Sequence, residues 1–230
     1  MLAEATAGPG TVATAIKTPR AASLAGIAFS VMFATALVLV RTAVPADPDD
    51  AGAWLSDSTR RDAILLALGF VPFAGIAFLW FVGVIRDRIG DAEDRFFATA
   101  FLGSGLLFVS MLFVASAIAA GVIATAAHNV DALVSSGAWD VARRATNELI
   151  VVYAMRMAGV FTLATSTILL RTRRAPRWLV ASGYVVAIVL LLTVSFVQWV
   201  ELLFPAWMFA LSLYLLVVSF RKDAEAVHAT

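Results

Sequence analysis

The chain has 230 residues, of which 61% are hydrophobic and 14% are charged, and its 17 lysines and arginines nearly balance 16 aspartates and glutamates to a net charge of +1. Soluble domains carry about a quarter charged residues and at most about half apolar ones, so this composition excludes a water-soluble globule. The absence of cysteine excludes disulfides, thiolate metal sites, iron–sulfur clusters and cysteine nucleophiles.

Continuous apolar runs separated by charged loops predict an all-α, polytopic transmembrane helical bundle. A helix needs about 20 apolar residues, at about 1.5 Å per residue, to cross roughly 30 Å of hydrocarbon. We expect a flexible N-terminal tail over residues 1–20, a membrane domain over 21–220 and a C-terminal tail over 221–230. The six predicted spans, in chain order, are residues 21–43, 63–85, 96–127, 147–170, 178–198 and 202–220.

The first span is preceded by Lys17 and Arg20, a pattern that also begins secretory signal peptides. Its apolar run to Val40 is longer than the usual apolar region of about 7–15 residues in such peptides, so we expect it to stay in the protein as a membrane span. The third span is longer than one perpendicular crossing needs, and it should therefore tilt or protrude.

The last two spans are the least distinct, because 178–220 is a stretch of 43 nearly uncharged residues. One alternative is a single helix followed by a re-entrant hairpin. Two spans are preferred, since the stretch is about twice one crossing and Gln198, Glu201 and Pro205 supply a polar turn near its middle.

The loops predict an orientation, because lysine and arginine are enriched on the cytoplasmic side of membrane proteins. With six spans, eleven of these residues fall on the side of both termini and five on the other, and the net charges are about +4 and −4. We therefore expect a multi-pass protein of the cell inner (plasma) membrane with both termini in the cytoplasm.

Arg156 is the one charged residue deep inside a predicted span, and burying it costs about 2.5–3.5 kcal/mol even on the lenient insertion scale. It should therefore face protein or a water-filled cavity. Glu201, at the outer end of the last spans, is the preferred partner, and Glu148 is the second choice. Tyr153 on the same helical face and Gln198 in the outer turn complete the predicted site.

This site has two main interpretations. In the first, Arg156 and Glu201 form a structural ion pair. In the second, Arg156 holds an anion, a carboxylate or a lipid headgroup in an outward-facing cavity. In a third interpretation, the arginine side chain only extends toward the membrane surface.

A second basic cluster lies between the fourth and fifth spans and contains no acidic residue. It consists of Arg171, Arg173, Arg174 and Arg177. It is primarily a topology signal, but such clusters also attract anionic lipid headgroups.

Small and aromatic residues indicate how the bundle packs. A stripe of small residues in the third span suits close packing within the bundle, with a second copy of the chain, or with another subunit of a membrane complex; it consists of Ala115, Ser116, Ala119 and Ala120. Tryptophans near the predicted outer boundary suit an interfacial aromatic belt; they are Trp54, Trp139, Trp199 and Trp207.

Sequence signatures of catalysis are missing from this chain. Its two histidines, His128 and His228, lie at a span boundary and in the C-terminal tail, so no buried pair is expected to ligate haem. The sequence has no Walker glycine loop, HExxH motif or GxSxG elbow. We therefore expect no cofactor, no metal, no nucleic-acid partner and no enzymatic activity.

Two segments resemble six-span integral membrane proteins of actinobacteria that have no assigned function. They are Trp80-Phe81-Val82-Gly83-Val84-Ile85-Arg86-Asp87-Arg88-Ile89-Gly90 and Val152-Tyr153-Ala154-Met155-Arg156-Met157-Ala158-Gly159-Val160-Phe161. The resemblance implies the fold but no activity. The leading hypothesis is a small binding or permeation protein with an outward-facing cavity around Arg156, and the alternative is a non-catalytic accessory or scaffold subunit of a membrane complex.

Overall fold

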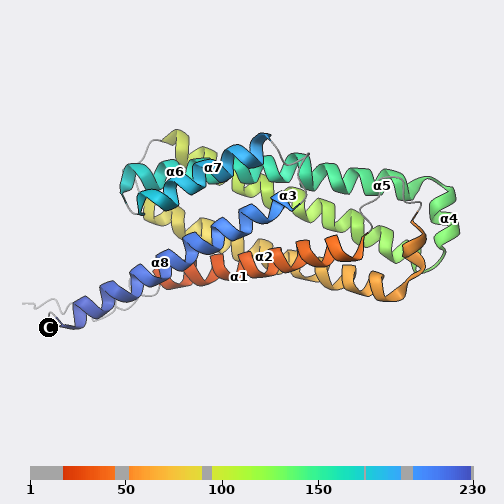
Figure 1. The fold of residues 1–230 in the computed structure, drawn as a ribbon, viewed down its shortest axis with the longest axis horizontal. Coiled ribbons are helices and arrows are strands. Elements are labelled where there is room, and N and C mark those ends of the chain that lie inside the picture. Colours follow the sequence, from red (N-terminus) through yellow and green to blue (C-terminus); the bar gives the residue numbers. More distant parts are fainter. Residues whose placement is uncertain (1–17, 45–51, 90–94, 174, 193–198, 229–230) are drawn as a thin grey trace, which may run out of the picture.

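The computed structural model describes residues 18–44, 52–89, 95–173, 175–192 and 199–228, and within these ranges every regular element is a helix (Figure 1). This confirms the predicted all-α class. In chain order the elements are α1 (Thr18–Ala43), η1 (Ala53–Ser56), α2 (Ser58–Ile89), α3 (Arg95–Ala126), α4 (Val130–Ser135), α5 (Ala138–Asn147), the π-helix η3 (Glu148–Ala154), α6 (Met155–Thr172), α7 (Arg177–Leu192), η4 (Val200–Leu202) and α8 (Leu203–His228).

Five helical stretches are long and apolar enough to cross a membrane, and they coincide with five of the six predicted spans. They are Arg20–Ala43, Ser58–Arg86, Phe96–Ala126, Ala138–Thr172 and Val200–Arg221. The remaining predicted span, 178–198, corresponds to α7, which has 16 residues. At about 1.5 Å per residue α7 is roughly 24 Å long, less than the hydrocarbon thickness of about 30 Å. Residues 193–198, with Gln198, lie outside the described residues.

Two predicted boundaries differ from the structure. The predicted fourth span begins at residue 147, but α5, η3 and α6 follow one another without a break and form one helix of 35 residues, Ala138–Thr172. The predicted C-terminal tail begins at residue 221, whereas α8 continues to His228.

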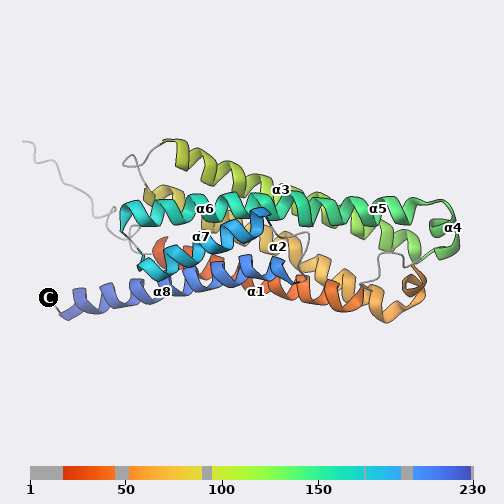
Figure 2. The same cartoon turned by 45° about the horizontal axis from the view of Figure 1, so that its top comes forward.

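The long helices lie side by side in a bundle, with α1 along α2, α8 along α1, and α6 between α3 and α7 (Figures 1 and 2). The start of α1 and the end of α8 lie at the same end of the bundle as the turn between α6 and α7; we call this the α6–α7 end. The opposite end carries η1, α4 and the start of α5, and we call it the α4 end (Figure 1).

The centre of the bundle is filled by phenylalanine side chains, whose ring centroids lie 4.8–6.2 Å apart. This aromatic core consists of Phe29, Phe33, Phe78, Phe101, Phe108, Phe161 and Phe204. A second, smaller hydrophobic cluster at the α4 end includes Leu55, Ile64, Ile123 and the tryptophans Trp54 and Trp139.

Glycines allow two pairs of helices to approach closely. A Cβ atom at Gly26 of α1 would lie 2.0 Å from the Ser212 hydroxyl of α8, and one at Gly183 of α7 would lie 2.1 Å from the Ser166 hydroxyl of α6. Both serines are buried. Such contacts between small residues are the usual way in which membrane helices pack.

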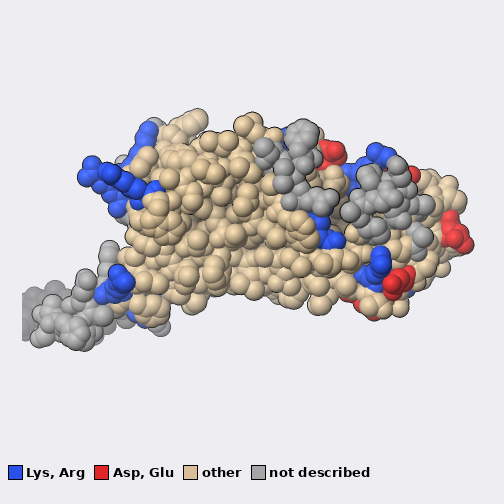
Figure 3. All heavy atoms as spheres, in the orientation of Figure 1, with Lys and Arg blue, Asp and Glu red and all other residues tan. Residues whose placement is uncertain are grey.

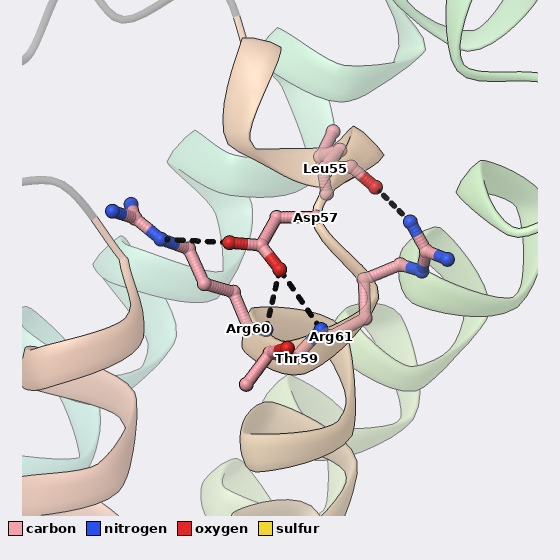
Figure 4. Close-up of polar contacts among 5 residues, drawn as sticks. All are labelled: Leu55, Asp57, Thr59, Arg60 and Arg61. Carbon is pink, nitrogen blue, oxygen red and sulfur yellow. Dashed lines mark hydrogen bonds and ion pairs between the residues drawn. The ribbon is translucent and has the colours of Figure 1, made fainter.

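The first turn of α2 is capped by Asp57 (Figure 4). Its Oδ1 accepts hydrogen bonds from the backbone N–H groups of Thr59 and Arg60, at 2.9 and 3.4 Å, and its Oδ2 lies 3.5 Å from Nε of Arg60. Arg61 donates to the backbone carbonyl of Leu55, which holds η1 against the same turn. A side-chain acceptor at this position satisfies N–H groups that have no partner inside the helix.

Charges gather at the two ends of the molecule. Figure 3 shows arginine side chains at the α6–α7 end, side chains of both signs toward the α4 end, and a broad surface between them with few charges. This distribution is typical of a helical bundle with its apolar middle in lipid.

Candidate ligand cavity

Arg156, the centre of the predicted site, is the second residue of α6 and is partly buried. Its neighbour Tyr153 is 55% exposed, while the buried face of α6 contains Met155, Ala158 and Gly159 instead. The predicted cavity around Arg156 does not form on the buried face of α6, where small and apolar residues take the inward positions.

The guanidinium of Arg156 bonds to its own helix. Nη1 donates to the backbone carbonyl of Val152 at 2.8 Å, and among the described residues Arg156 forms no ion pair. Side chains on a helix point toward its N-terminus, which for α6 is the α4 end. The geometry therefore agrees with the third interpretation, an arginine that extends along its helix toward the nearer end of the bundle.

Glu201 is paired with Arg41, not with Arg156. Its Oε1 accepts a hydrogen bond of 2.8 Å from Nη2 of Arg41, and the residue is only 4% exposed. Glu201 lies in η4, which packs against α1 near the end of that helix. The predicted partner is therefore wrong, because the arginine that ends the first span lies closer to Glu201 than the arginine inside the fourth.

The backbone beside this ion pair is strained. Trp199, which precedes η4, has φ of 69° and ψ of 3°. A side chain in this left-handed region costs about 1–3 kcal/mol, and such strain clusters at functional sites. The turn places Glu201 under the end of α1.

The Arg41–Glu201 pair lies on the wall of a cavity with a volume of about 630 Å³. This volume lies within the range of small-molecule sites. The cavity is lined by residues of α1, η1, α2, α3, α5, η3 and η4. Neither Arg156 nor Tyr153 lines it. Much of its wall is apolar and comes from Phe33, Ala36, Leu37, Val40, Ile64, Ala67, Leu68, Val71, Leu112, Val122, Ile123, Ile150 and Val151.

The charged side chains of the cavity lie toward the α4 end of its wall. On α1 the lining runs from Phe33 to Arg41, a rise of about 12 Å. On the facing helix, Glu148, Arg144 and Arg143 follow one another in the same direction. The part of the cavity nearest the aromatic core, its floor, is therefore apolar, whereas the wall toward the α4 end carries charged side chains among apolar ones.

Three arginines and two glutamates line the cavity, so its charged side chains sum to +1. Arg41 is matched by Glu201, and Arg143 lies 6.0 Å from the ring centroid of Trp139. Arg144 is exposed and forms no ion pair within the described ranges. Glu148, predicted as the second partner of Arg156, contributes to the cavity wall instead.

The small-residue stripe of the third span provides space for the cavity. Ala115, Ser116 and Ala119 all line it. The sequence predicts that this stripe packs against another helix. In the structure the short side chains leave part of this space unfilled, and a larger residue at these positions would occupy it.

The cavity is bounded at its two ends by aromatic side chains. Phe33 belongs both to the cavity wall and to the aromatic core below it. At the α4 end, Trp54 and Trp139 pack edge to face with ring centroids 5.6 Å apart. Gly52, at φ of 85°, fits against this pair, since a Cβ there would lie 3.0 Å from Nε1 of Trp139.

The predicted belt of interfacial tryptophans is largely wrong. Of the four predicted belt residues, Trp54, Trp139 and Trp207 are buried, and Trp199 alone is substantially exposed. Trp207 donates from Nε1 to the backbone carbonyl of Leu179 at 3.3 Å. Position near a span boundary does not tell whether an indole faces lipid or a neighbouring helix.

In the described part of the chain, no three His, Asp or Glu side chains lie close enough together to hold a metal ion. Three of the four predicted headgroup arginines, Arg171, Arg173 and Arg177, lie at the other end of the bundle. Arg171 is placed over the ring of Phe97, 4.6 Å from its centroid, and Arg173 and Arg177 line a separate cavity. Arg174 lies outside the described residues.

Comparisons of this chain with protein-family models, with curated proteins and with solved structures found no match. The resemblance to six-span actinobacterial proteins therefore stays a prediction.

Proposed function

We propose that this protein crosses the inner membrane six times, with α7 as the short sixth crossing and both termini in the cytoplasm, and that it binds an anionic amphiphile in the cavity at the α4 end. In this orientation the α4 end faces the outside of the cell. The protein acts by binding and not by catalysis.

The observation that carries this proposal is that the charged side chains of the cavity gather toward the α4 end, while its floor is apolar. An acyl chain would lie among Phe33, Val71 and Leu112, and a carboxylate or phosphate would lie beside Arg143 and Arg144. The planar guanidinium group suits both anions because it offers parallel N–H donors.

The aromatic core favours binding over conduction. It fills the bundle centre directly below the cavity, starting from Phe33. An ion or a polar solute that entered the cavity would meet packed phenylalanine rings next. A ligand held from one side fits this arrangement better than a permeant one.

The test is to fill the cavity without changing its charge. Ala119→Phe places a ring in the cavity, and Ala117→Phe on the same helix is the matched control, because Ala117 is exposed and does not line it. In nanodiscs, a long-chain fluorescent fatty acid should bind to the wild type and to Ala117→Phe. Ala119→Phe should weaken its binding at least tenfold.

The charged wall is tested with the same probe and its methyl ester. The ester should bind at least tenfold more weakly than the acid, and Arg144→Gln should reduce this preference, whereas Arg221→Gln at the other end of the bundle should not. Equal binding of the acid to Ala119→Phe and Ala117→Phe would refute the site, and equal binding of acid and ester would refute the anionic headgroup.

The second candidate function, an accessory subunit, is favoured by one observation: Tyr153 is exposed near the middle of a 35-residue helix, and Arg156, one turn further along, is only partly buried. A partner helix with an acidic side chain would satisfy this arginine. A photo-cross-linking residue in place of Tyr153 should then give a discrete protein adduct in membranes. Adducts with lipid alone would refute this role.

A further inference from the structure

The α6–α7 end of the bundle contains a second cavity, separate from the proposed ligand cavity. Its volume is about 480 Å³, and it lies in the turn from α6 to α7. Two arginines, Arg173 and Arg177, line it together with the apolar side chains of Leu170 and Val180. The turn belongs to the surface region where Figure 3 shows clustered basic side chains.

The backbone of this turn is held in an unusual conformation. Arg173 has φ of 51° and ψ of 32°, and its N–H contacts the carbonyls of Leu169 and Leu170. Helices commonly end on a left-handed residue of this kind, which is usually glycine because side chains are strained there. Here the position carries a guanidinium at the edge of the cavity.

The two lining arginines differ from Arg171 and Arg20, which also lie at this end. Arg171 and Arg20 are placed over the rings of Phe97 and Phe220, at 4.6 and 4.4 Å from the centroids. Arg173 and Arg177 form no ion pair in the part of the chain that the structure describes, and residues 171–177 include no acid. Their charges are therefore not neutralised locally.

The start of α7 adds to the positive potential of the cavity. Arg177 is the first residue of this 16-residue helix, whose N-terminal N–H groups carry a partial positive charge. Pro176, before it, accepts hydrogen bonds from the N–H groups of Leu179 and Val180 and fixes the start of the helix. Two guanidinium groups, a helix N-terminus and an apolar wall thus meet in one cavity.

We propose that this cavity binds the phosphate group of an anionic phospholipid, with the phosphate between Arg173 and Arg177 and the first chain carbons against Leu170 and Val180. Of the four arginines predicted to attract lipid headgroups, this proposal assigns phosphate binding to two. This inference is independent of the proposed function, because the two cavities lie at opposite ends of the bundle.

In the experiment, lipid is titrated into the detergent-solubilised full chain, and the bound lipid is measured by native mass spectrometry. The variant R173Q/R177Q is compared with R86Q/R221Q, which removes the same charge from two exposed arginines outside the cavity. Phosphatidylglycerol should bind to the wild type and to R86Q/R221Q with affinities within about twofold. R173Q/R177Q should lose at least tenfold, and phosphatidylcholine should show no such difference.

A third variant separates the cavity from general electrostatics. Ala175→Trp fills the cavity and leaves every charge in place, and it should also weaken phosphatidylglycerol binding. Because the measurements are made in micelles, a change of membrane orientation cannot cause the loss. Thermal unfolding midpoints without lipid show whether each variant is folded. If R173Q/R177Q is unfolded, the binding measured for Ala175→Trp decides the test.

Soluble competitors distinguish the source of the phosphate. If glycerol phosphate displaces phosphatidylglycerol, the site recognises the phosphate alone and a free phosphate ester can occupy it. If it does not, the chain carbons on Leu170 and Val180 are required. Equal losses in R173Q/R177Q and R86Q/R221Q, or unchanged binding to Ala175→Trp, would overturn the proposal.

Discussion

At the scale of single residues, the buried carboxylate of Glu201 depends on Arg41. Removing one partner of a fully buried ion pair costs about 3–5 kcal/mol. The Arg41 side chain is 38% exposed, so water screens part of this interaction. We expect Arg41→Met to lower the free energy of unfolding in detergent by about 1–3 kcal/mol.

The controls for this prediction are Arg156→Met and a double variant. Arg156 bonds only to a carbonyl of its own helix in the described structure, so Arg156→Met should cost less than Arg41→Met. Arg41→Met with Glu201→Leu removes both charges and should recover much of the stability. A double variant as unstable as Arg41→Met would contradict the ion pair as the cause.

Asp57 gives a second prediction at this scale. Its carboxylate caps α2 through the N–H groups of Thr59 and Arg60, and loss of such a cap costs about 1 kcal/mol. Asp57→Ala should lower the unfolding midpoint, while Asp57→Ser should retain most of the stability. Asp62→Ala, which removes an exposed carboxylate of the same helix, is the control. Equal losses for Asp57→Ala and Asp62→Ala would argue against the cap.

At the scale of elements, the close approach of α6 and α7 depends on Gly183. A Cβ there would lie 2.1 Å from Ser166 Oγ and 2.8 Å from the Trp207 ring. The serine can rotate away but the indole is buried, so the helices must separate. Overpacking of this kind costs about 1–3 kcal/mol, and we expect Gly183→Ala to destabilise the bundle by that amount.

Gly103→Ala is the matched control for Gly183→Ala. A Cβ at Gly103, inside α3, would meet no heavy atom within 4 Å. Replacement of such a helical glycine by alanine stabilises a helix by about 0.5–1 kcal/mol. Opposite signs for the two substitutions, measured by denaturant titration in the same detergent, would confirm the contact, and a neutral Gly183→Ala would refute it.

The π-helix η3 connects α5, which lines the cavity, to α6, which packs into the core of the bundle. Met155 N–H bonds to the carbonyl of Ile150, five residues earlier. A π-segment widens the helix and is frequent at functional sites. Here it lies between the charged cavity residues of α5 and the buried face of α6, and its own residues Glu148, Ile150 and Val151 line the cavity.

At the scale of the whole molecule, the proposed orientation is directly testable because the chain has no native cysteine. Ser136→Cys is exposed at the α4 end, and Arg221→Cys is exposed at the other. A membrane-impermeant maleimide should label Ser136→Cys in intact cells and Arg221→Cys only after permeabilisation. Labelling of both in intact cells would contradict six crossings, since an odd number of crossings puts the termini on opposite sides.

The sequence alone was sufficient for the helical class and for five membrane-length helices, because an uncharged run of about 20 apolar residues is rarely anything but a membrane helix. The Arg41–Glu201 pair could not be predicted, since it depends on η4 packing against α1, two elements 160 residues apart. The aromatic core was missed for a similar reason: Phe29 and Phe33 lie one turn apart, but in an apolar span nothing distinguishes inward from lipid-facing phenylalanine.

The sequence predicts a cavity around Arg156, whereas the cavity in the structure is lined by other residues. A lone arginine in an apolar span predicts a cavity around itself, yet the residues that form the cavity are ordinary in the sequence: alanines of the third span, and charges at the ends of helices. Alanines that suit a packing surface leave a cavity when no large side chain faces them. That arrangement is a property of helix neighbours, which one sequence does not specify.

The length of the Ala138–Thr172 helix has a consequence for how a ligand would arrive. Its 35 residues extend about 50 Å, against roughly 30 Å of hydrocarbon, and a tilt of about 20° shortens its projection by only about 3 Å. In a bilayer, close to 20 Å of this helix must therefore stand in the headgroup layer and the water beyond it. The arginines of α5 then lie level with the lipid phosphates, so an amphiphile could slide sideways from the leaflet into the protein without leaving the membrane.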